Sequence, residues 1–432
     1  MTNTMLRYFF VLIAISLTIS CSNKRGVTED PAKVMDQSVS NSLELKTVNL
    51  YIENSASIYG YVNGPTGYVN VINDLAQFRN IISETSATFS YKLISGKKEG
   101  IKTYDLGSNT AALSEVLTPK GLAKPTSGNS DLNDMFKKVL ESINENSISL
   151  LISDGIYDVG DQNNPLGALE TQGLDTRTTF INEVKKNDTQ MIVIKLFSDF
   201  KGTYYHGISK SMEVIDQKRP YYVWVFGHKK LLDTFFSDDR LSELKEYDNH
   251  AVFHKLGRDT VASSTIAFGN KGLRKSQGET HVLEMSGSSR TTSIAFSLAV
   301  DYSELRLNES YLTDINNYKS SNGFEIESIK TIERVKSEDD KVDRALKSLS
   351  SIQPTHIITV VRSEYKGGLC EISFMSNLPG WIAATSIQSD NPIKGNTTQT
   401  FGFSTLINGI NQAFQEVSER NEIQKFTIKL KN

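Results

Sequence analysis

The sequence predicts an α/β protein, with a mostly parallel sheet carrying helices on both faces, followed by a β-rich domain that could be a sandwich. Two observations support this prediction. Between residues 46 and 245, apolar strand-like runs alternate with segments whose apolar residues recur at helical spacing. From about residue 250 onward, strand-like runs follow one another, separated by Gly, Ser, Asn and Lys. Alternation favours a parallel sheet, and consecutive strands favour a separate β domain. We therefore expect an α/β domain over residues 46–245 and a β-rich domain over residues 250–432.

The elements of the first domain follow from the spacing of apolar side chains. Strands are expected where β-branched and aromatic residues cluster, and helices where apolar residues recur three or four positions apart. The expected strands are 47–52, 88–94, 101–105, 148–153, 190–197 and 220–226, and the expected helices are 66–85, 131–144, 176–187 and 228–245. A short polar turn joins the second and third strands, which predicts a hairpin. The run 148–153 is mainly apolar, which suits a buried parallel strand.

The second domain is expected to consist mainly of strands. These are 262–268, 281–286, 292–300, 356–361, 369–375 and 425–430. The charged stretch 330–347 is predicted to be a solvated helix or a long connection, and residues 406–414 a short amphipathic helix. Cys370 lies in an alternating strand pattern and is expected to be a small core residue.

The N-terminus has the layout of a secretory signal. A basic residue, Arg7, precedes the apolar run 8–17, and small and hydroxyl residues lead to Cys21. The apolar run is shorter than the roughly 20 residues that span a membrane. The tract 17–21 resembles a lipobox, in which the processing enzyme leaves a diacylated cysteine as the new N-terminus, although Thr18 stands where an apolar residue is expected. We therefore predict a signal peptide over residues 1–20 and a lipid on Cys21. The alternative is ordinary cleavage that leaves a free cysteine.

Composition agrees with an exported globular protein anchored at a bacterial membrane, on its periplasmic or surface side. Residues 21–45 are rich in Ser, Asn, Asp and Lys and lack apolar periodicity, so we expect a flexible tether after the lipidated cysteine. The formal net charge of −3 argues against a nucleic-acid partner. The sequence has two cysteines. If Cys21 carries a lipid, Cys370 has no partner for an internal disulfide.

Polar residues gather where ligands of α/β sheets bind, at the carboxyl ends of the strands. Glu53, Ser55 and Ser57 follow the first strand. Ser130 precedes the helix 131–144, where it is also a good N-cap residue, and Asp154 follows the strand 148–153. We expect these five side chains to converge on one pocket. The alternative is that the serines cap turns and helices, while Asp154 accepts hydrogen bonds from backbone amides.

With these residues in this order, the region 46–245 resembles the von Willebrand factor A family. The family's metal-ion-dependent adhesion site has Asp-x-Ser-x-Ser after the first strand, a threonine before a later helix, and Asp-Gly after the fourth strand. The resemblance implies a magnesium site, with manganese as a substitute, that an acidic group of a partner completes. Glu53 replaces the first aspartate and Ser130 replaces the threonine. The longer Glu53 side chain could ligate the ion directly or crowd the octahedral geometry that magnesium requires.

Several tyrosines lie near the same edge in the sequence. Exposed tyrosines are typical of recognition surfaces, because they combine a large contact area with a hydroxyl group. The candidates for partner contact are Tyr59, Tyr61, Tyr68, Tyr157, Tyr204 and Tyr205. The alternative is that they pack loops onto the sheet.

Three functions remain open from the sequence. The favoured one is a lipid-anchored module that binds a protein or glycan partner. The second is a magnesium-dependent hydrolase, with the ion held by Glu53 and Asp154 and phosphate esters as substrates. That chemistry needs a positioned base and a charge clamp, and the sequence places no evident Lys or Arg beside these carboxylates. The third is a structural subunit of an envelope complex with a decayed metal site.

The prediction for the anchor is tested by Cys21→Ser. This change removes the lipid acceptor, so the protein should move from the membrane fraction to the soluble periplasmic or secreted fraction. The measurement is immunoblotting of fractionated cells, together with labelled fatty acid on the wild type. A variant that stays in the membrane fraction, with no label on the wild type, would refute lipidation.

Overall fold

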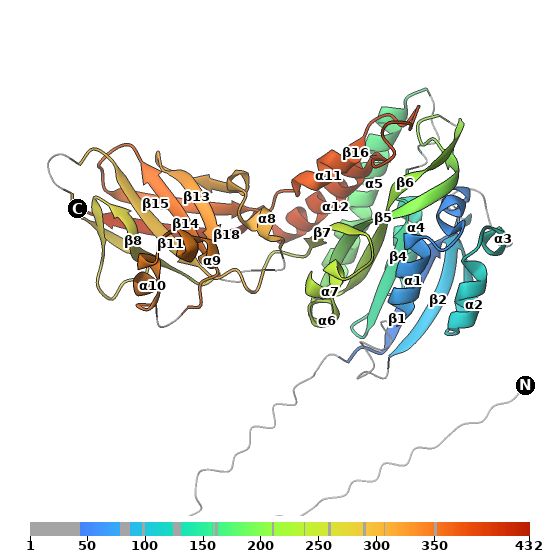
Figure 1. The fold of residues 1–432 in the computed structure, drawn as a ribbon, viewed down its shortest axis with the longest axis horizontal. Coiled ribbons are helices and arrows are strands. Elements are labelled where there is room, and N and C mark those ends of the chain that lie inside the picture. The colour runs from blue at the N-terminus through green and yellow to red at the C-terminus, as the bar shows by residue number, and fades with distance from the viewer. Residues whose placement is uncertain are drawn as a thin grey trace, which may run out of the picture. The chain divides into compact units, whose positions relative to one another are not determined.

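The computed structural model describes most of the chain after the N-terminal segment (Figure 1). The described residues are 44–77, 87–96, 100–123, 131–157, 159, 163–209, 211–236, 238–257, 261–287, 291–305, 307–349 and 352–432. The predicted signal peptide, Cys21, all of the predicted tether before residue 44, and Ser130 lie outside them. Leu45, at the end of the predicted tether, is buried in the core. No helix in the described ranges is long and apolar enough to cross a membrane.

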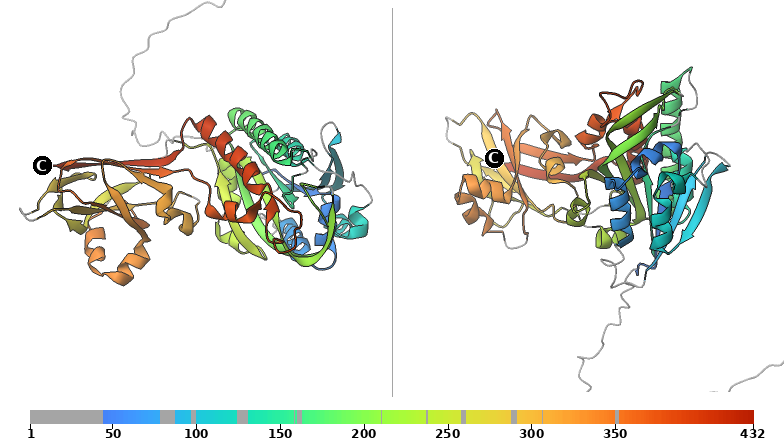
Figure 2. Two further views of the ribbon diagram at one scale, coloured as in Figure 1. Left: turned by 90° about the horizontal axis from the view of Figure 1, so that it is seen from above. Right: turned by 45° about the vertical axis from the view of Figure 1, so that its right-hand side comes forward.

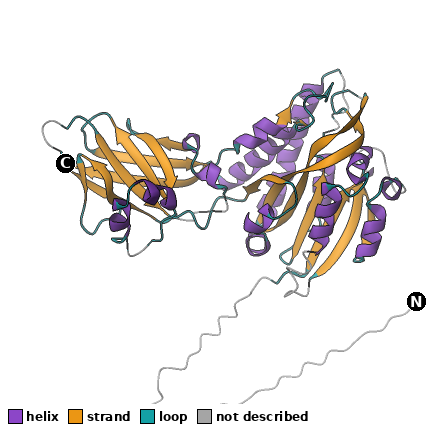
Figure 3. Ribbon diagram, in the orientation of Figure 1, coloured by secondary structure: helices purple, strands orange, loops and turns teal. Residues whose placement is uncertain are grey.

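The first part of the chain builds an α/β lobe (Figure 3). Its elements, in order, are β1 (Thr47–Glu53), the 3₁₀ helix η1 (Ala56–Val62), α1 (Gly67–Gln77), β2 (Thr88–Ser95), β3 (Lys102–Gly107), α2 (Thr110–Val116), α3 (Pro119–Leu122), α4 (Leu132–Leu140), β4 (Ser147–Ser153), α5 (Pro165–Lys186), β5 (Thr189–Tyr205), β6 (Met212–His228), α6 (Lys229–Phe235), α7 (Asp238–Ser242) and β7 (Tyr247–Phe253).

The sheet of this lobe has seven strands in the order β3-β2-β1-β4-β6-β5-β7. β1 lies between β2 and β4 and is parallel to both. β3, β6 and β7 run in the opposite direction to β1, β2, β4 and β5. The predicted α/β class is therefore confirmed, as is the hairpin of β2 and β3. Every residue of β4 is buried, as the apolar run 148–153 predicted.

Alternate residues of the strands pack toward opposite faces of the sheet. Along β6, residues 221, 223 and 225 belong to the same core as apolar residues of α1. Residues 222, 224 and 226 belong to a second core, together with apolar residues of α4 and α5. This period of two is the ordinary geometry of a strand, and it explains why residues 221–226, buried on both faces, are all aliphatic or aromatic.

The long hairpin of β5 and β6 differs from the expected pair of parallel strands. The two strands pair antiparallel from Thr189 opposite His228 to Tyr205 opposite Met212. Only the apolar halves, near 190–197 and 220–226, were predicted. The outer halves contain charged residues and glycine, because much of that ribbon faces solvent, so they lack the apolar pattern of a buried strand.

The second part of the chain forms a lobe of two sheets, which we call the sandwich lobe (residues 261–375 and 422–432). Its elements are β8 (Ser263–Lys271), β9 (Leu273–Lys275), β10 (Val282–Met285), β11 (Ile294–Val300), α8 (Glu309–Leu312), η3 (Ile315–Asn317), β12 (Tyr318–Ser320), β13 (Glu325–Thr331), α9 (Ile332–Glu338), α10 (Lys341–Leu346), β14 (His356–Arg362), β15 (Gly368–Met375) and β18 (Glu422–Lys431). The sheets have the orders β12-β15-β18-β10-β9 and β13-β14-β11-β8.

The two sheets share one hydrophobic core, which is the arrangement of a β-sandwich. Cys370 of β15 lies in this core, as predicted, and burial raises the pKa of its thiol to about 12. The charged stretch 330–347 contains α9 and α10, whose apolar residues cover the outer face of the smaller sheet.

Between β15 and β18 the chain returns to the α/β lobe. This returning segment contains α11 (Gly380–Thr385), β16 (Ser386–Ile387), β17 (Thr400–Phe401) and α12 (Phe403–Ser418). α12 lies alongside α5 (Figure 2), and its apolar residues belong to the same core as α4 and α5. The helices meet at two glycines, since a Cβ on Gly409 would lie 2.4 Å from the carbonyl oxygen of Gly173. The predicted helix at 406–414 therefore exists, but it completes the α/β lobe and not the sandwich.

A shortened chain tests the role of α12. A chain of residues 44–257 lacks this helix and exposes the apolar face around Trp224, so it should aggregate or melt well below a chain of residues 44–432. The measurement is thermal unfolding followed by circular dichroism and light scattering. A soluble fragment with a cooperative transition at the temperature of the longer chain would contradict this role.

Candidate functional site

The carboxyl ends of β1 and β4 bring the predicted site residues together. The strands are parallel neighbours, with Ile52 opposite Ile152, so the residues that follow them lie side by side. The Ser55 and Ser57 hydroxyl oxygens are 2.8 Å apart, and the Ser57 hydroxyl is close enough to Asp154 to oppose the rise in the pKa of its carboxyl. Three of the five predicted residues are therefore connected.

Of the other two predicted site residues, Glu53 is described by the structure and Ser130 is not. Glu53 is the last residue of β1, and its charge acts on two buried tyrosines of the same region, Tyr61 and Tyr68. Ser130 lies outside the described residues. The N-cap of α4 is its neighbour Asp131, which accepts a hydrogen bond of 3.0 Å from the backbone nitrogen of Asp134.

The backbone after β4 fixes the direction of Asp154. Gly155 has a φ of +70°, and a Cβ there would lie 2.7 Å from the Tyr222 ring. Glycine tolerates both constraints because it has no side chain. The Ser153 hydroxyl accepts a hydrogen bond from Gly155 N at 2.9 Å, and Asp154 Oδ1 accepts one from Ile156 N at 3.1 Å. The Asp-Gly pair thus holds the carboxylate toward Ser57.

The two carboxylates of this site are buried, which the sequence did not predict, and Ser57 is half-buried. Glu53 is 4% exposed and Asp154 is 2% exposed. The ribbon of β5 and β6 covers the site from one side, with the Phe200 ring packed against Gly60 of η1. The returning segment covers it from another, where the Tyr222 hydroxyl donates to Thr400 Oγ1 at 2.9 Å. Among the described residues, Glu53 and Asp154 are therefore covered against direct contact with a partner's acidic group.

A buried arginine, Arg219 of β6, lies in the same region. It was not predicted from the sequence as a site residue. Its side chain is completely buried, and its guanidinium carbon lies 4.3 Å from the centre of the Tyr204 ring. Nη1 donates to the carbonyl oxygen of Thr397 at 3.4 Å, and the charge acts on Asp154. In the sequence, Arg219 directly precedes the predicted strand 220–226 and belongs to no recognisable motif. Only the pairing of β6 with β4 brings it to this edge.

The pKa directions show how these charges balance. Burial raises the pKa of Asp154, while the Ser57 hydroxyl, the Ile156 backbone nitrogen and Arg219 oppose that rise. Burial alone would lower the pKa of Arg219, yet Tyr61, Tyr204 and Asp154 raise it overall. The guanidinium therefore stays charged and serves as a counter-charge for the buried carboxylate.

A third buried carboxylate, that of Asp390, comes from the returning segment. It accepts hydrogen bonds from the Tyr204 hydroxyl at 2.7 Å, from Gly207 N at 2.7 Å and from Ile208 N at 3.3 Å. These bonds tie the returning segment to the end of β5 and the turn that follows it. Asp390 therefore holds the cover of the site in place.

Four of the six tyrosines that were predicted to contact a partner are buried, so the prediction is wrong for them. Tyr61, Tyr68, Tyr157 and Tyr204 are buried, so in this structure they pack the loops onto the sheet and offer no contact surface. Tyr59 is half-buried. Tyr205 is exposed and remains a candidate for partner contact.

The donor set fits a magnesium ion only in part. Glu53, Ser55, Ser57 and Asp154 offer hard oxygen atoms, which suit magnesium or manganese. The charge of Arg219 next to Asp154 opposes a second cation, because like charges repel strongly in a buried site. Within the described ranges, no three or more His, Cys, Asp or Glu residues form a group that could hold a metal ion. The oxygen donors therefore suit a magnesium ion, but the buried positive charge of Arg219 disfavours one.

Comparison of the chain with protein-family models, with curated proteins and with solved structures finds no match.

The role of Arg219 is tested by Arg219→Met, which keeps the length of the side chain and removes its charge. Leaving a buried carboxylate without its counter-charge should cost about 3–5 kcal/mol of unfolding free energy at neutral pH. The loss should shrink as the pH falls from neutral, because burial raises the pKa of Asp154 and the protonated carboxyl needs no counter-charge. Urea unfolding at several pH values measures both effects.

Arg219→Lys is the matched control, because it keeps a positive charge and should lose less stability than Arg219→Met. Equal losses for both variants at every pH would show that Arg219 acts through packing alone, which would contradict the charge balance.

Proposed function

We propose that the chain is an exported, lipid-anchored binding protein of a bacterial envelope, whose α/β lobe is a variant of the von Willebrand factor A fold. The N-terminal pattern up to Cys21 supports export and anchoring. The parallel strands β2, β1 and β4, with antiparallel β3 after the first helix, support the fold. The convergence of Ser55, Ser57 and Asp154 at the ends of β1 and β4 supports the variant site.

We infer that Arg219 supplies the positive charge that a metal ion supplies in the family. Its guanidinium is buried and interacts with Asp154. A charge fixed by covalent attachment needs no ion from solution. The edge would then stabilise the lobe, and partner binding would occur on another surface. Magnesium, with manganese as a substitute, remains the second candidate, because the oxygen donors suit it.

The observation that carries the binding function is an exposed apolar face on the ribbon of β5 and β6. Val214 is 75% exposed, Met212 is 64% exposed and Tyr205 is 39% exposed. Tyr205 pairs with Met212, and Val214 lies two residues along the same strand, so the three side chains share one face. Tyr204 and Ile215 on the opposite face are buried. Grouped exposed apolar side chains favour an interaction surface for a protein or glycan partner.

The buried edge disfavours a hydrolase and agrees with a structural subunit. A hydrolase would have to admit its substrate to Glu53 and Asp154, and both are covered. A structural subunit with a decayed metal site agrees with the buried Arg219, and it differs from the favoured proposal only in whether the ribbon contacts a partner.

Photo-cross-linking in intact cells separates these possibilities. A photoreactive amino acid at position 214 should form a discrete adduct with one envelope component, identified by mass spectrometry, because the ribbon face contacts it. The same amino acid at exposed Glu325 of the sandwich lobe is the control and should not form that adduct.

Specificity is tested by adding Met212→Asp to the chain that is labelled at position 214. The charged side chain should reduce the adduct, since it lies on the same face. No adduct at position 214, or the same adducts at position 325, would refute the ribbon as the contact surface.

A further inference from the structure

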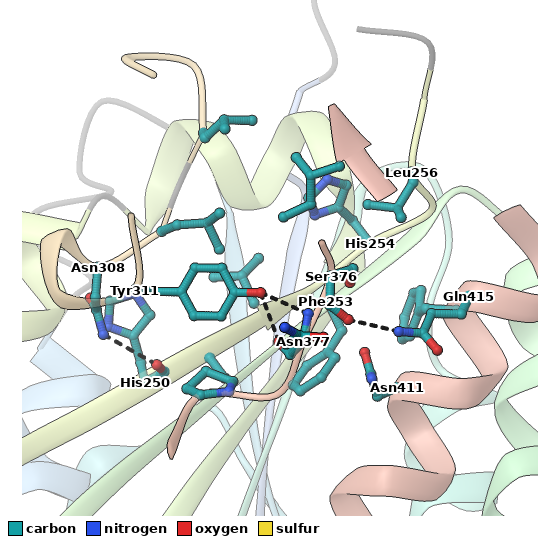
Figure 4. A pocket seen from close by; sticks show the side chains of 17 residues that line it. His250, Phe253, His254, Leu256, Asn308, Tyr311, Ser376, Asn377, Asn411 and Gln415 are labelled. Atoms are coloured by element: carbon teal, nitrogen blue, oxygen red, sulfur yellow. Dashed lines mark hydrogen bonds between the residues drawn. The ribbon is translucent and has the colours of Figure 1, made fainter. Parts of the chain in front are cut away.

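A cavity lies where the α/β lobe meets the sandwich lobe, far in sequence from the carboxyl edge of the sheet (Figure 4). β7 and α12 form one side of it. The segment before and within α8, together with residues 376 and 377, forms the other side. It leaves about 60 Å³ for the centres of water-sized molecules. Junctions between lobes are common places for small-ligand sites.

The walls of this cavity are mainly apolar and held in place. The rings of Phe253 and Phe414 lie 6.2 Å apart between centroids and are inclined by 30°. The Tyr311 hydroxyl lies 2.9 Å from the carbonyl oxygen of Met375 and accepts a hydrogen bond from Asn377 N at 2.8 Å. Fixed aromatic walls favour a ligand with an apolar face.

Side-chain amides provide the polar part of the lining. Gln415 Nε2 donates to the carbonyl oxygen of Ser376 at 2.7 Å, and Asn308 Nδ2 donates to that of His250 at 3.4 Å. Asn411 of α12 is only 8% exposed and lines the same cavity, and its amide makes no hydrogen bond to any described residue (Figure 4). Buried amides nearly always have partners, so Asn411 offers an unused donor and acceptor to a ligand.

The charge of the lining restricts the ligand. No Asp, Glu, Lys or Arg is among the described residues that line the cavity, and its histidines are His250 and His254. An ionic ligand would lose its hydration without gaining a counter-charge, which is unfavourable. The ligand should therefore be neutral.

We propose that this cavity binds a neutral sugar unit of a glycan. The apolar face of a pyranose ring packs against Phe253 and Phe414, and its hydroxyl groups pair with the amide of Asn411. A hydroxyl both donates and accepts, as an amide does, so one sugar satisfies both ends of this side chain. The inference deepens the proposed binding function by naming a ligand class, but it depends on neither the ribbon nor Arg219.

Saturation-transfer NMR on the chain without its signal peptide tests this proposal. The probes are the methyl glycosides of glucose and N-acetylglucosamine, with glucuronic acid as a charged comparison. The wild type should transfer saturation to at least one neutral glycoside and not to glucuronic acid. Asn411→Leu should weaken that binding by about tenfold or more, because it removes both hydrogen-bonding atoms.

The matched control is Asn408→Leu, the same change at an exposed position of the same helix, which should leave binding unchanged. Asn411→Ala serves as a second variant if Asn411→Leu melts at a lower temperature. Failure of the wild type to bind either neutral glycoside at tens of millimolar would overturn the proposal. Equal binding by the wild type and the Asn411 variants would also overturn it. Neither result affects the cross-linking test of the ribbon, so the two proposals fail separately.

Discussion

The burial of one guanidinium, that of Arg219, is the constraint on which the architecture of the α/β lobe depends. A buried charge is tolerated only where opposite charge and hydrogen bonds surround it. Here Asp154 after β4, Tyr204 on β5 and Thr397 of the returning segment provide these interactions. Four segments distant in the chain therefore meet at the carboxyl edge of the sheet. Asp390 reinforces this arrangement by fixing the returning segment to the end of β5 and its turn.

The sequence predicted that the residues at the carboxyl edge would both lie together and be accessible to a partner. Three of the five residues that resemble an adhesion site, Ser55, Ser57 and Asp154, lie together, yet the carboxylates of Glu53 and Asp154 are covered by protein. We therefore propose that contact with other molecules occurs at the apolar face of the β5–β6 ribbon and in the cavity between the lobes. In this account the edge holds the lobe together, and the lobe presents the ribbon. The lipid that we propose on Cys21 would keep both near the membrane.

Local patterns predicted much of the fold, because burial on one or two faces leaves a regular trace in the sequence. β1, β4 and the hairpin of β2 and β3 were predicted in this way, as were Cys370 in its strand and the convergence of the residues that follow β1 and β4. Features that depend on distant pairing were not predicted. The outer halves of β5 and β6 carry polar residues and so lack the apolar pattern of a strand. α12 packs on the α/β lobe although the strands β8 to β15 of the sandwich lobe lie between them in the sequence. Arg219 belongs to no recognisable motif. The buried tyrosines were misassigned for the same reason, since their cover comes from the ribbon and the returning segment.

The central claim, that Arg219 takes the place of a metal ion, is tested most directly by the response of the protein to that ion. An ion that binds only the native state raises its stability by about 2.7 kcal/mol at a hundredfold excess over the dissociation constant. The measurement is the melting temperature of the wild type and of Asp154→Ala in millimolar magnesium or manganese and in chelator. The account predicts no change in the wild type with either ion. A rise in the wild type that is absent in Asp154→Ala would show that the ion binds at this edge, and it would contradict the account.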